Sequence, residues 1–319
     1  MNNSLYQNQE KNIQEKSFGE RPNSGMGLLI GQNLTYVKGI LGEPQRIDES
    51  FYGYQWYIYN TDYSRYVQVG VENNKVVTVY AIGDNLDVSP FKIGQPIEEI
   101  FNTQSVETNI DIEFKGNSYR FELNDTDLNI RPLIKLGDVF VQLYIDQFTG
   151  SVSSVRFLND ETLIKQRPYE LVYSGELIEA LEPSEEMWRV IEEGSEKEIY
   201  DITNVMRIRH NVNRLKWDEE TSAVALGHSK DMSDNNDFSH TSKKFGSLSD
   251  RLEAASVAYK SAGENIAANY TDGPAVAEGW LNSKGHRESL LNEDFTHLGV
   301  GVYQKYYTQN FIQKSEDNK

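Results

Sequence analysis

The sequence contains no cysteine among its 319 residues, and it is poor in several other features that would point to a function. Without cysteine, a disulfide framework, a thiolate metal site and a thiol nucleophile are all excluded. No apolar run reaches the roughly 18 residues that a membrane-spanning helix needs, and residues 1–20 lack the apolar core of a signal peptide. We therefore predict no transmembrane segment and no export signal within this chain.

Basic residues are also scarce, because 31 Lys and Arg stand against 49 Asp and Glu and give a net charge of -18. Such a field repels a phosphate backbone unless a dense basic patch opposes it. The most basic stretch, Arg207 to Arg214, spaces its charges along a predicted helix among acidic residues. Nucleic acid is therefore not an expected partner.

Hydrophobic residues make up 38% of the chain, which is enough for folded cores, and the length predicts two domains. Residues 1–23 are polar and have no sustained period, so we expect a solvated tail there. From residue 24 to 160, short runs rich in Tyr, Val and Ile alternate with polar residues, as half-buried strands do. This domain is predicted to be mostly β with short helices, and its hairpins are expected to turn at Asn73 and Asn74, at Gly116 and Asn117, and at Thr149 and Gly150.

Two helical segments in the β-rich domain begin with the same three residues, Ile-Gly-Gln, at Ile30 and at Ile93. Predicted strands follow each segment, which suggests an internal duplication of a helix-then-strands unit. A chance match of so short a motif is the alternative.

The strand at residues 51–59 has aromatic side chains on both of its faces. A central strand packed on both sides explains this pattern. The functional alternative is an exposed aromatic face that binds a polysaccharide or a protein partner.

A linker is predicted at residues 161–183, where no clear period is visible, and helical spacing begins after it. Ser184 is expected to cap a first helix that runs to about Asn211 with a break near Gly194. Asp218 caps a second predicted helix, and Ser247 with Asp250 has the spacing of a capping box for a third.

A fourth helix is expected to begin near Pro274 and to end at Gly285. Two alternating strands then follow at residues 298–304 and 306–313. Residues 184–319 are therefore predicted to form an α+β domain.

All five histidines lie in this second domain, and none is paired at the i, i+4 spacing of a zinc metalloprotease helix. His228 is on the apolar face of its predicted helix and is expected to be a hydrogen-bonded core residue. His210 and His297 lie at the ends of predicted elements and are expected to be structural. For His240 and His286 the sequence leaves two alternatives, a structural role and a functional one.

Five sequence blocks carry a family resemblance, and they follow one another over about 115 residues. They are EIYDITNVMRIRHNVNRLKWDEETSAVALGHSKDM (198–232), FSHTS (238–242), GENIA (263–267), GWLNSKGHRESLLNEDFTHLGVGV (279–302) and YTQNFI (307–312). In type and order these blocks resemble the CAP (SCP-like) superfamily, which implies an α-β-α sandwich. Residues 24–160 resemble, more generally, the CAP-associated domain that precedes the CAP domain in some Gram-positive bacterial proteins.

The resemblance also implies a cleft. In animal and plant members two histidines and two acidic residues face a central cleft and can hold a divalent metal. His240, Glu264 and His286 fall on three of those positions, and Ser283 falls on the fourth, where those proteins carry a glutamate. Zinc suits two imidazoles and one carboxylate, whereas calcium and magnesium prefer several oxygens. The alternative without a metal is that Glu264 only accepts ring protons from the histidines.

We expect an extracellular or cell-surface protein of a Gram-positive-type bacterium that binds a small ligand, a peptide or a cell-envelope component and is not an enzyme. The alternative is a metal-dependent surface hydrolase, a protease or an esterase. Ser239, Ser242 and Ser283 lie near the histidines in the sequence, but no nucleophile-elbow motif surrounds them. Glu264 is also unsuited to serve as metal ligand and general base at once.

Overall fold

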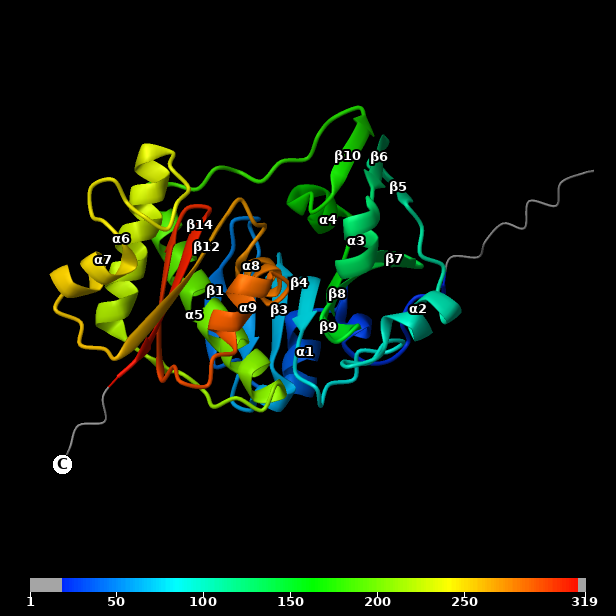
Figure 1. Cartoon of the computed structure of the whole chain (residues 1–319). Helices are drawn as coiled ribbons and strands as arrows, with labels where there is room; N and C mark the ends of the chain where they lie inside the picture. Colours follow the sequence, from blue (N-terminus) through cyan, green and yellow to red (C-terminus); the bar gives the residue numbers. More distant parts are fainter. Residues whose placement is uncertain (1–18, 315–319) are drawn as a thin grey trace, which may run out of the picture.

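The computed structural model describes residues 19–314, which form an N-terminal region and a C-terminal region that pack against each other (Figure 1). The N-terminal region is mostly β, and the C-terminal region is a small sheet between helices. The predicted α+β class is therefore confirmed. The predicted solvated tail, residues 1–23, falls almost wholly outside the described residues.

The N-terminal region is built on a seven-stranded antiparallel sheet with the strand order β1-β2-β3-β4-β9-β8-β7. Its strands are β1 (Arg46–Glu49), β2 (Gln55–Tyr59), β3 (Val67–Glu72), β4 (Lys75–Ala81), β7 (Leu133–Leu136), β8 (Val139–Asp146) and β9 (Ser151–Leu158). The helical segments that accompany it are η1 (Met26–Leu29), α1 (Leu34–Leu41), η2 (Tyr63–Arg65) and α2 (Ile97–Thr103).

A second, three-stranded sheet with the order β10-β6-β5 completes this region. It consists of β5 (Asn109–Phe114), β6 (Asn117–Glu122) and β10 (Glu170–Ser174), with α3 (Asp125–Ile130) and α4 (Asp160–Gln166) nearby in the chain. The three predicted hairpins are all present as β3–β4, β5–β6 and β8–β9. At the first of them Asn73 and Asn74 have φ angles of 49° and 62°, the left-handed conformation that a tight two-residue hairpin requires.

The predicted duplication is not shown by this topology. The strands after α1 all belong to the large sheet, whereas those directly after α2 form the small one. The two Ile-Gly-Gln segments therefore do not introduce equivalent sets of strands.

The aromatic strand at residues 51–59 is a central strand packed on both sides. Trp56 and Ile58 are 1% and 0% exposed and face the C-terminal region, while Tyr57 and Tyr59 pack in the separate core on the other side of the sheet. The alternative of an exposed aromatic face is therefore wrong, because docking of the C-terminal region covers that face.

The C-terminal region is a three-layer α-β-α sandwich (Figure 1). Its sheet has the order β11-β13-β14-β12 and comprises β11 (Lys216–Trp217), β12 (Ser261–Ala268), β13 (His297–Tyr303) and β14 (Tyr306–Gln313). The helices are α5 (Glu185–Arg209), α6 (Glu219–Asn235), α7 (Leu248–Ala254), α8 (Gly273–Leu281) and α9 (Lys284–Leu290). Gly301 lets β13 lie directly against α6, since a Cβ there would come within 1.9 Å of the Leu226 nitrogen.

The predicted helix starts in this region are confirmed by their caps. The side chains of Ser184 and Asp218 accept hydrogen bonds from Met187 and Thr221 backbone nitrogens, and Ser247 forms a complete capping box. The predicted break at Gly194 is wrong, because α5 is continuous. The prediction that Gly285 ends a helix is also wrong: it lies inside α9, a separate short helix that the sequence analysis missed.

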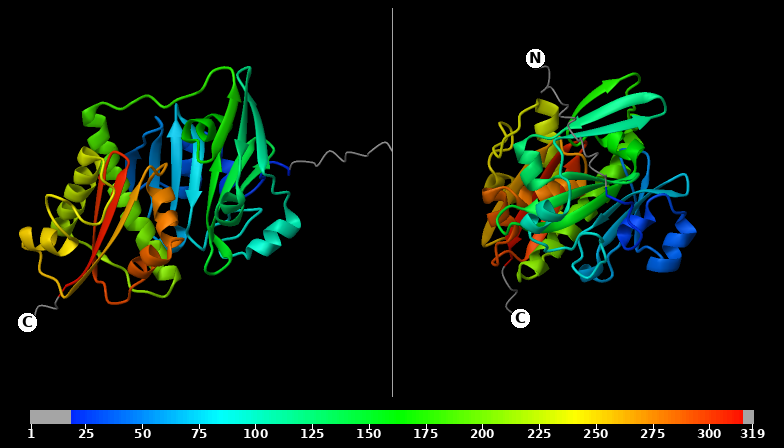
Figure 2. Two further views of the ribbon diagram at one scale, coloured as in Figure 1. Left: turned by 45° about the horizontal axis from the view of Figure 1, so that its top comes forward. Right: turned by 90° about the vertical axis from the view of Figure 1, so that its right-hand side faces the viewer.

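The predicted linker at residues 161–183 contains most of α4 and all of β10, so only residues 167–169 and 175–183 lie outside helices and strands. The longer of these segments, residues 175–183, is the connection to α5. This segment runs along one side of the molecule from β10 to α5 (Figure 2). The two regions share one hydrophobic cluster, in which Tyr54 and Trp56 of the N-terminal region pack with Ile202 and Trp280 of the C-terminal region. The regions therefore behave as one packed body.

Ion pairs reinforce this contact. Arg156 on β9 is 0% exposed and pairs with Asp272, the cap of α8, at 2.9 Å. Asp146 on β8 pairs with Arg287 of α9 at 2.9 Å and contacts His210 at 3.2 Å. Burial acts to raise the pKa of Asp146, but hydrogen bonds from His210 and Arg287 outweigh it and hold the pKa at about 2.

Limited proteolysis is expected to cut the chain within residues 175–183 without separating the two pieces. Leu181 is 90% exposed in this segment, and the shared core holds both sides together. Treatment with a glutamate-specific protease, which finds Glu176, Glu179 and Glu182 there, should give two bands in a denaturing gel and one peak in native size-exclusion chromatography. Separate native elution of the two fragments would contradict the single packed body.

Candidate functional site

The cleft residues that the sequence resemblance implies lie around one edge of the C-terminal sheet. Glu264 is on β12, which is an edge strand, His240 is in the loop between α6 and α7, and His286 is on α9. Ser283 is the N-cap residue of α9. His240, Glu264 and His286, from three separate stretches of the chain, are thus brought together by β12 and the helices beside it.

Glu264 is the centre of the cleft. Its side chain is only 4% exposed, and its Oε1 accepts a hydrogen bond from Nδ1 of His240 at 2.9 Å. Its Oε2 accepts a hydrogen bond from Nη2 of Arg251 at 2.6 Å, and the Arg251 side chain is only 5% exposed. Both oxygens of the carboxylate are therefore held by donors, one of which is a permanent cation.

His240 presents its other ring nitrogen outward. Its side chain is 56% exposed, and because Nδ1 is held by Glu264, Nε2 is the nitrogen left for a ligand. His286 is half-buried nearby. Burial, and then the positive charge of His240, lower the pKa of His286, so its imidazole is neutral at neutral pH.

His228 also belongs to this cluster. Its side chain is 0% exposed, and its Nε2 lies 3.9 Å from Oε1 of Glu264, beyond hydrogen-bond distance. Burial lowers the pKa of His228, although the charge of Glu264 and a hydrogen bond with the Ser239 backbone oppose this. The predicted core position of His228 is confirmed.

Ser283 is the weakest member of the predicted set. Its hydroxyl forms no hydrogen bond with another described residue and does not cap α9 through its side chain. The other two histidines lie at the ends of elements, His210 after α5 and His297 at the start of β13, as predicted. His297 contacts the Thr296 hydroxyl at 2.8 Å, and His210 contacts the Met206 carbonyl at 2.8 Å.

The cleft does not fit a preformed divalent metal site. Within residues 19–314, no group of three or more His, Cys, Asp or Glu side chains is placed to hold a metal ion. The reason is visible at Glu264, whose Oε2 is occupied by the Arg251 guanidinium and whose Oε1 is occupied by His240. A metal would have to displace one of these donors and lie close to a fixed positive charge. Zinc binding therefore stays a prediction.

Arg251 is the residue of this cleft that sequence reasoning missed. It precedes Glu264 by 13 residues and sits on the short helix α7, so neither a motif nor a period links the two. The capping box at Ser247 predicted the helix. Only the packing of α7 against β12 brings the guanidinium to the carboxylate.

The fold and the cleft geometry define a CAP-domain protein, and comparisons agree. The family model for the cysteine-rich secretory protein family (CAP) matches residues 200–314, and the CAP-associated N-terminal model matches residues 30–169. The membrane protein YlbC of Bacillus subtilis is 53% identical over 304 residues, which cover 94% of this chain and 88% of the relative. The chain therefore belongs to the CAP family, although it has none of the cysteines in the family's name.

Two solved structures resemble the whole chain. An extracellular protein with an SCP domain from Bacillus anthracis is 46% identical, with a TM-score of 0.88, over 94% of this chain and 99% of that protein. A cysteine-rich secretory protein from Staphylococcus aureus is 31% identical, with a TM-score of 0.82, over 93% of this chain and 98% of that protein. The arrangement of a CAP-associated domain before a CAP domain is thus common to these proteins.

Proposed function

We propose that this chain is an extracellular or cell-surface binding protein without catalytic activity, whose CAP cleft recognises a small ligand or a peptide. The observation that carries this proposal is the double engagement of the Glu264 carboxylate. Arg251 and His240 hold both of its oxygens, so it orients His240 and is not free to take a proton from water. The exposed Nε2 of His240 and the neutral ring of His286 are then available for a ligand's polar groups.

The three serines near the histidines support binding over hydrolysis. Ser239 accepts a hydrogen bond from the Thr241 nitrogen, and Ser242 accepts two in the turn that follows. Within residues 19–314, neither of these hydroxyls nor that of Ser283 is hydrogen-bonded to a histidine. A serine nucleophile needs such a base within reach.

The location is supported by the relatives. The Bacillus anthracis protein is described as extracellular and the Bacillus subtilis protein as a membrane protein. In the part of the chain that the structure describes, no helix is both long enough and apolar enough to cross a bilayer. A cell-envelope component is therefore the class of partner that we propose, and we propose no role for nucleic acid.

The cleft is tested first by metal titration. We expect zinc to bind more tightly than calcium or magnesium, because imidazole nitrogen suits zinc and the second carboxylate is replaced by Ser283. Isothermal titration calorimetry of untagged protein should show the zinc signal lost in His286→Ala and retained in His297→Ala, a histidine outside the cleft. Equal affinity for all three metals, or zinc binding untouched by His286→Ala, would leave only a hydrogen-bonded structural cluster.

The hydrolase alternative is tested in the same variants. Wild-type protein should give no turnover above the buffer rate with a panel of peptide and ester substrates, with or without added zinc. The binding proposal would be contradicted if wild-type protein showed turnover and His240→Ala lost it without a change in the far-ultraviolet circular dichroism spectrum. The chain would then be a hydrolase.

A further inference from the structure

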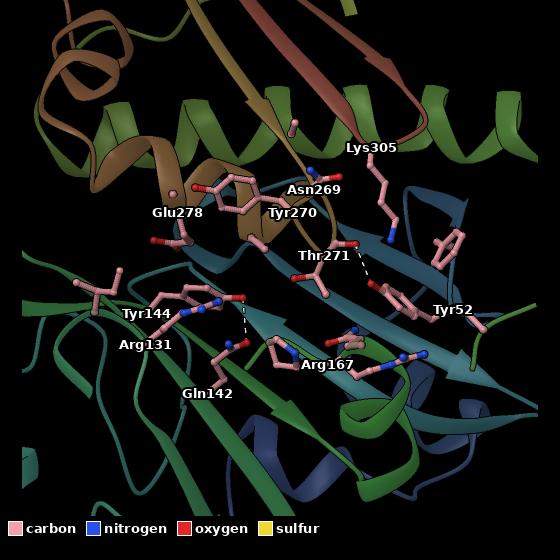
Figure 3. Close-up of a pocket in the computed structure, with 18 of the residues that line it drawn as sticks. Tyr52, Arg131, Gln142, Tyr144, Arg167, Asn269, Tyr270, Thr271, Glu278 and Lys305 are labelled. Carbon is pink, nitrogen blue, oxygen red and sulfur yellow. Dashed lines mark hydrogen bonds between the residues drawn. The ribbon is translucent and has the colours of Figure 1, made fainter. Parts of the chain in front are cut away.

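A large cavity lies between the two domains and is separate from the CAP cleft. Its volume is about 1260 Å³, and neither His240, Glu264 nor His286 lines it. The CAP domain contributes the end of β12, one face of α8 and the β13–β14 turn, while the CAP-associated domain contributes β8 and the ends of α3 and α4 (Figure 3). Pockets for small molecules usually measure roughly 300–1,000 Å³, so this cavity accommodates a longer ligand.

Three cations from three different segments face this cavity. Arg131 follows α3, Arg167 follows α4, and Lys305 lies in the β13–β14 turn, so that Lys305 and Arg167 enter from opposite sides (Figure 3). Arg167 is held with a φ angle of 46°, a conformation in which glycine or asparagine is usual. Lys305 lies 4.7 Å from the ring centre of Phe51 and has no carboxylate partner within residues 19–314.

The carboxylates around the cavity offset these cations only in part. Arg131 already pairs with Asp127 at 2.7 Å, and Glu182 also lines the cavity, where it accepts a hydrogen bond from Nε1 of Trp188 at 3.1 Å. Glu179 pairs with Arg167 at 3.2 Å but is 67% exposed, so that pair is weak and open to exchange. Glu278 is 1% exposed and accepts hydrogen bonds from Tyr80 at 2.9 Å and Ser154 at 2.5 Å. Burial raises the pKa of Glu278 and favours its neutral form.

One wall of the cavity is a stretch of backbone with free hydrogen-bonding groups. Residues 179–182 line the cavity, and residues 177–183 form no backbone hydrogen bond with any other described residue. The segment is drawn out between β10 and α5 (Figure 1). Unpaired extended backbone is a template on which another extended chain can pair.

We propose that this interdomain cavity binds an extended peptide that carries carboxylate side chains. The peptide backbone pairs with residues 177–183, and its carboxylates lie against Arg131, Arg167 and Lys305. Polar side chains such as Gln142 and Asn269, together with Tyr52 and Tyr270, provide amide and aromatic contacts along the cavity. This site is independent of the proposed cleft function, since Glu264 and Ala268 are four residues apart on β12, or about 13 Å.

The net charge of -18 limits which anionic ligands are suitable. At physiological salt the field of distant charges is screened beyond about 8 Å, so the groups that line the cavity, Lys305 and Arg167 among them, set the local field. A long polyanion would extend into the repulsive field outside. A short peptide with two or three carboxylates would not.

The experiment uses the full chain and a fluorescein-labelled eight-residue peptide of alternating Glu and Val. The control is the same peptide with every Glu replaced by Gln. Fluorescence anisotropy at physiological salt should show the Glu peptide binding at least about tenfold more tightly. Arg167→Gln and Lys305→Gln should each weaken binding by about three- to tenfold. Lys216→Gln, an exposed lysine on β11, should leave it unchanged.

Backbone pairing is tested by proline, which removes one N–H donor. In an extended chain, successive backbone N–H groups point to opposite sides, so only one of Ala180 and Leu181 donates to the bound peptide. One of the two variants Ala180→Pro and Leu181→Pro should therefore weaken binding by about tenfold. The control Leu181→Ala keeps the N–H group and should not weaken binding. Circular dichroism melts of all variants establish that they fold.

The proposal would be overturned by equal binding of the two peptides, by no effect of Arg167→Gln and Lys305→Gln, or by displacement of the peptide by a neutral chito-oligosaccharide at similar affinity. Binding that is lost in His240→Ala but kept in Arg167→Gln would place the peptide in the CAP cleft. That outcome would overturn this proposal while supporting the proposed function.

Discussion

Replacing Arg251 by methionine is expected to lower the free energy of unfolding by about 3–5 kcal/mol, because it leaves the Glu264 carboxylate buried without its cation. The carboxylate is 4% exposed and the guanidinium 5%, so water replaces the lost partner poorly. Urea denaturation followed by far-ultraviolet circular dichroism measures the change. The double variant Arg251→Met, Glu264→Gln should recover part of the loss, because no charge is then left unpaired.

The matched control is Lys243→Met, which breaks an equally short ion pair on the surface. Lys243 and Asp237 are 2.7 Å apart, but the lysine side chain is 87% exposed, so we expect no measurable change. A loss below about 1 kcal/mol at pH 8 would show that the buried pair does not stabilise the cleft.

Arg251→Met also has a functional consequence. With the guanidinium removed, Oε2 of Glu264 is released for a cation, so zinc should bind the variant more tightly than wild-type protein in the same calorimetric titration. Unchanged zinc affinity would show that Arg251 does not compete with the metal.

Replacing Arg156 by methionine is the second change with a large expected effect, about 3–5 kcal/mol, and it acts between the domains. Arg156 is fully buried and pairs with Asp272 at 2.9 Å, and its guanidinium lies about 5.5 Å from the ring centre of Tyr80. Asp272 is also the N-cap of α8, so the stranded carboxylate weakens the start of that helix. Thermal unfolding followed by tryptophan fluorescence and circular dichroism should show a lower midpoint in both signals.

Rescue distinguishes the lost ion pair from lost packing. Asparagine is neutral and caps helices as well as aspartate, so Arg156→Met, Asp272→Asn should recover much of the stability. Arg120→Met, which removes an exposed pair with Asp111, is the control and should leave the midpoint unchanged. If the double variant is no more stable than Arg156→Met, packing around Arg156 accounts for the effect and the ion pair does not.

The sequence by itself determined the local structure and the family. Alternating valines on both sides of Asn73 and Asn74 determined a hairpin, and Asp218 and Ser247 determined two helix starts, because these signals depend only on neighbouring residues. The order of the CAP blocks placed Glu264 and His240 in one cleft, and the structure joins them by a hydrogen bond. The prediction that Gly285 ends a helix was wrong, because glycine commonly follows the last turn of a helix and no local signal indicated the separate helix α9.

Only the tertiary structure decided which groups meet across long separations. The aromatic pattern of the strand at residues 51–59 is the same whether a partner protein or another part of the chain covers it. In the structure, packing of α5 and α8 against it makes it part of an interdomain core. Arg251 reaches Glu264, and Arg156 reaches Asp272 from 116 residues away, through contacts between elements that no local pattern encodes. The interdomain cavity depends on the same docking. Charge pairs of this kind follow from how whole elements pack, and so they were beyond the sequence.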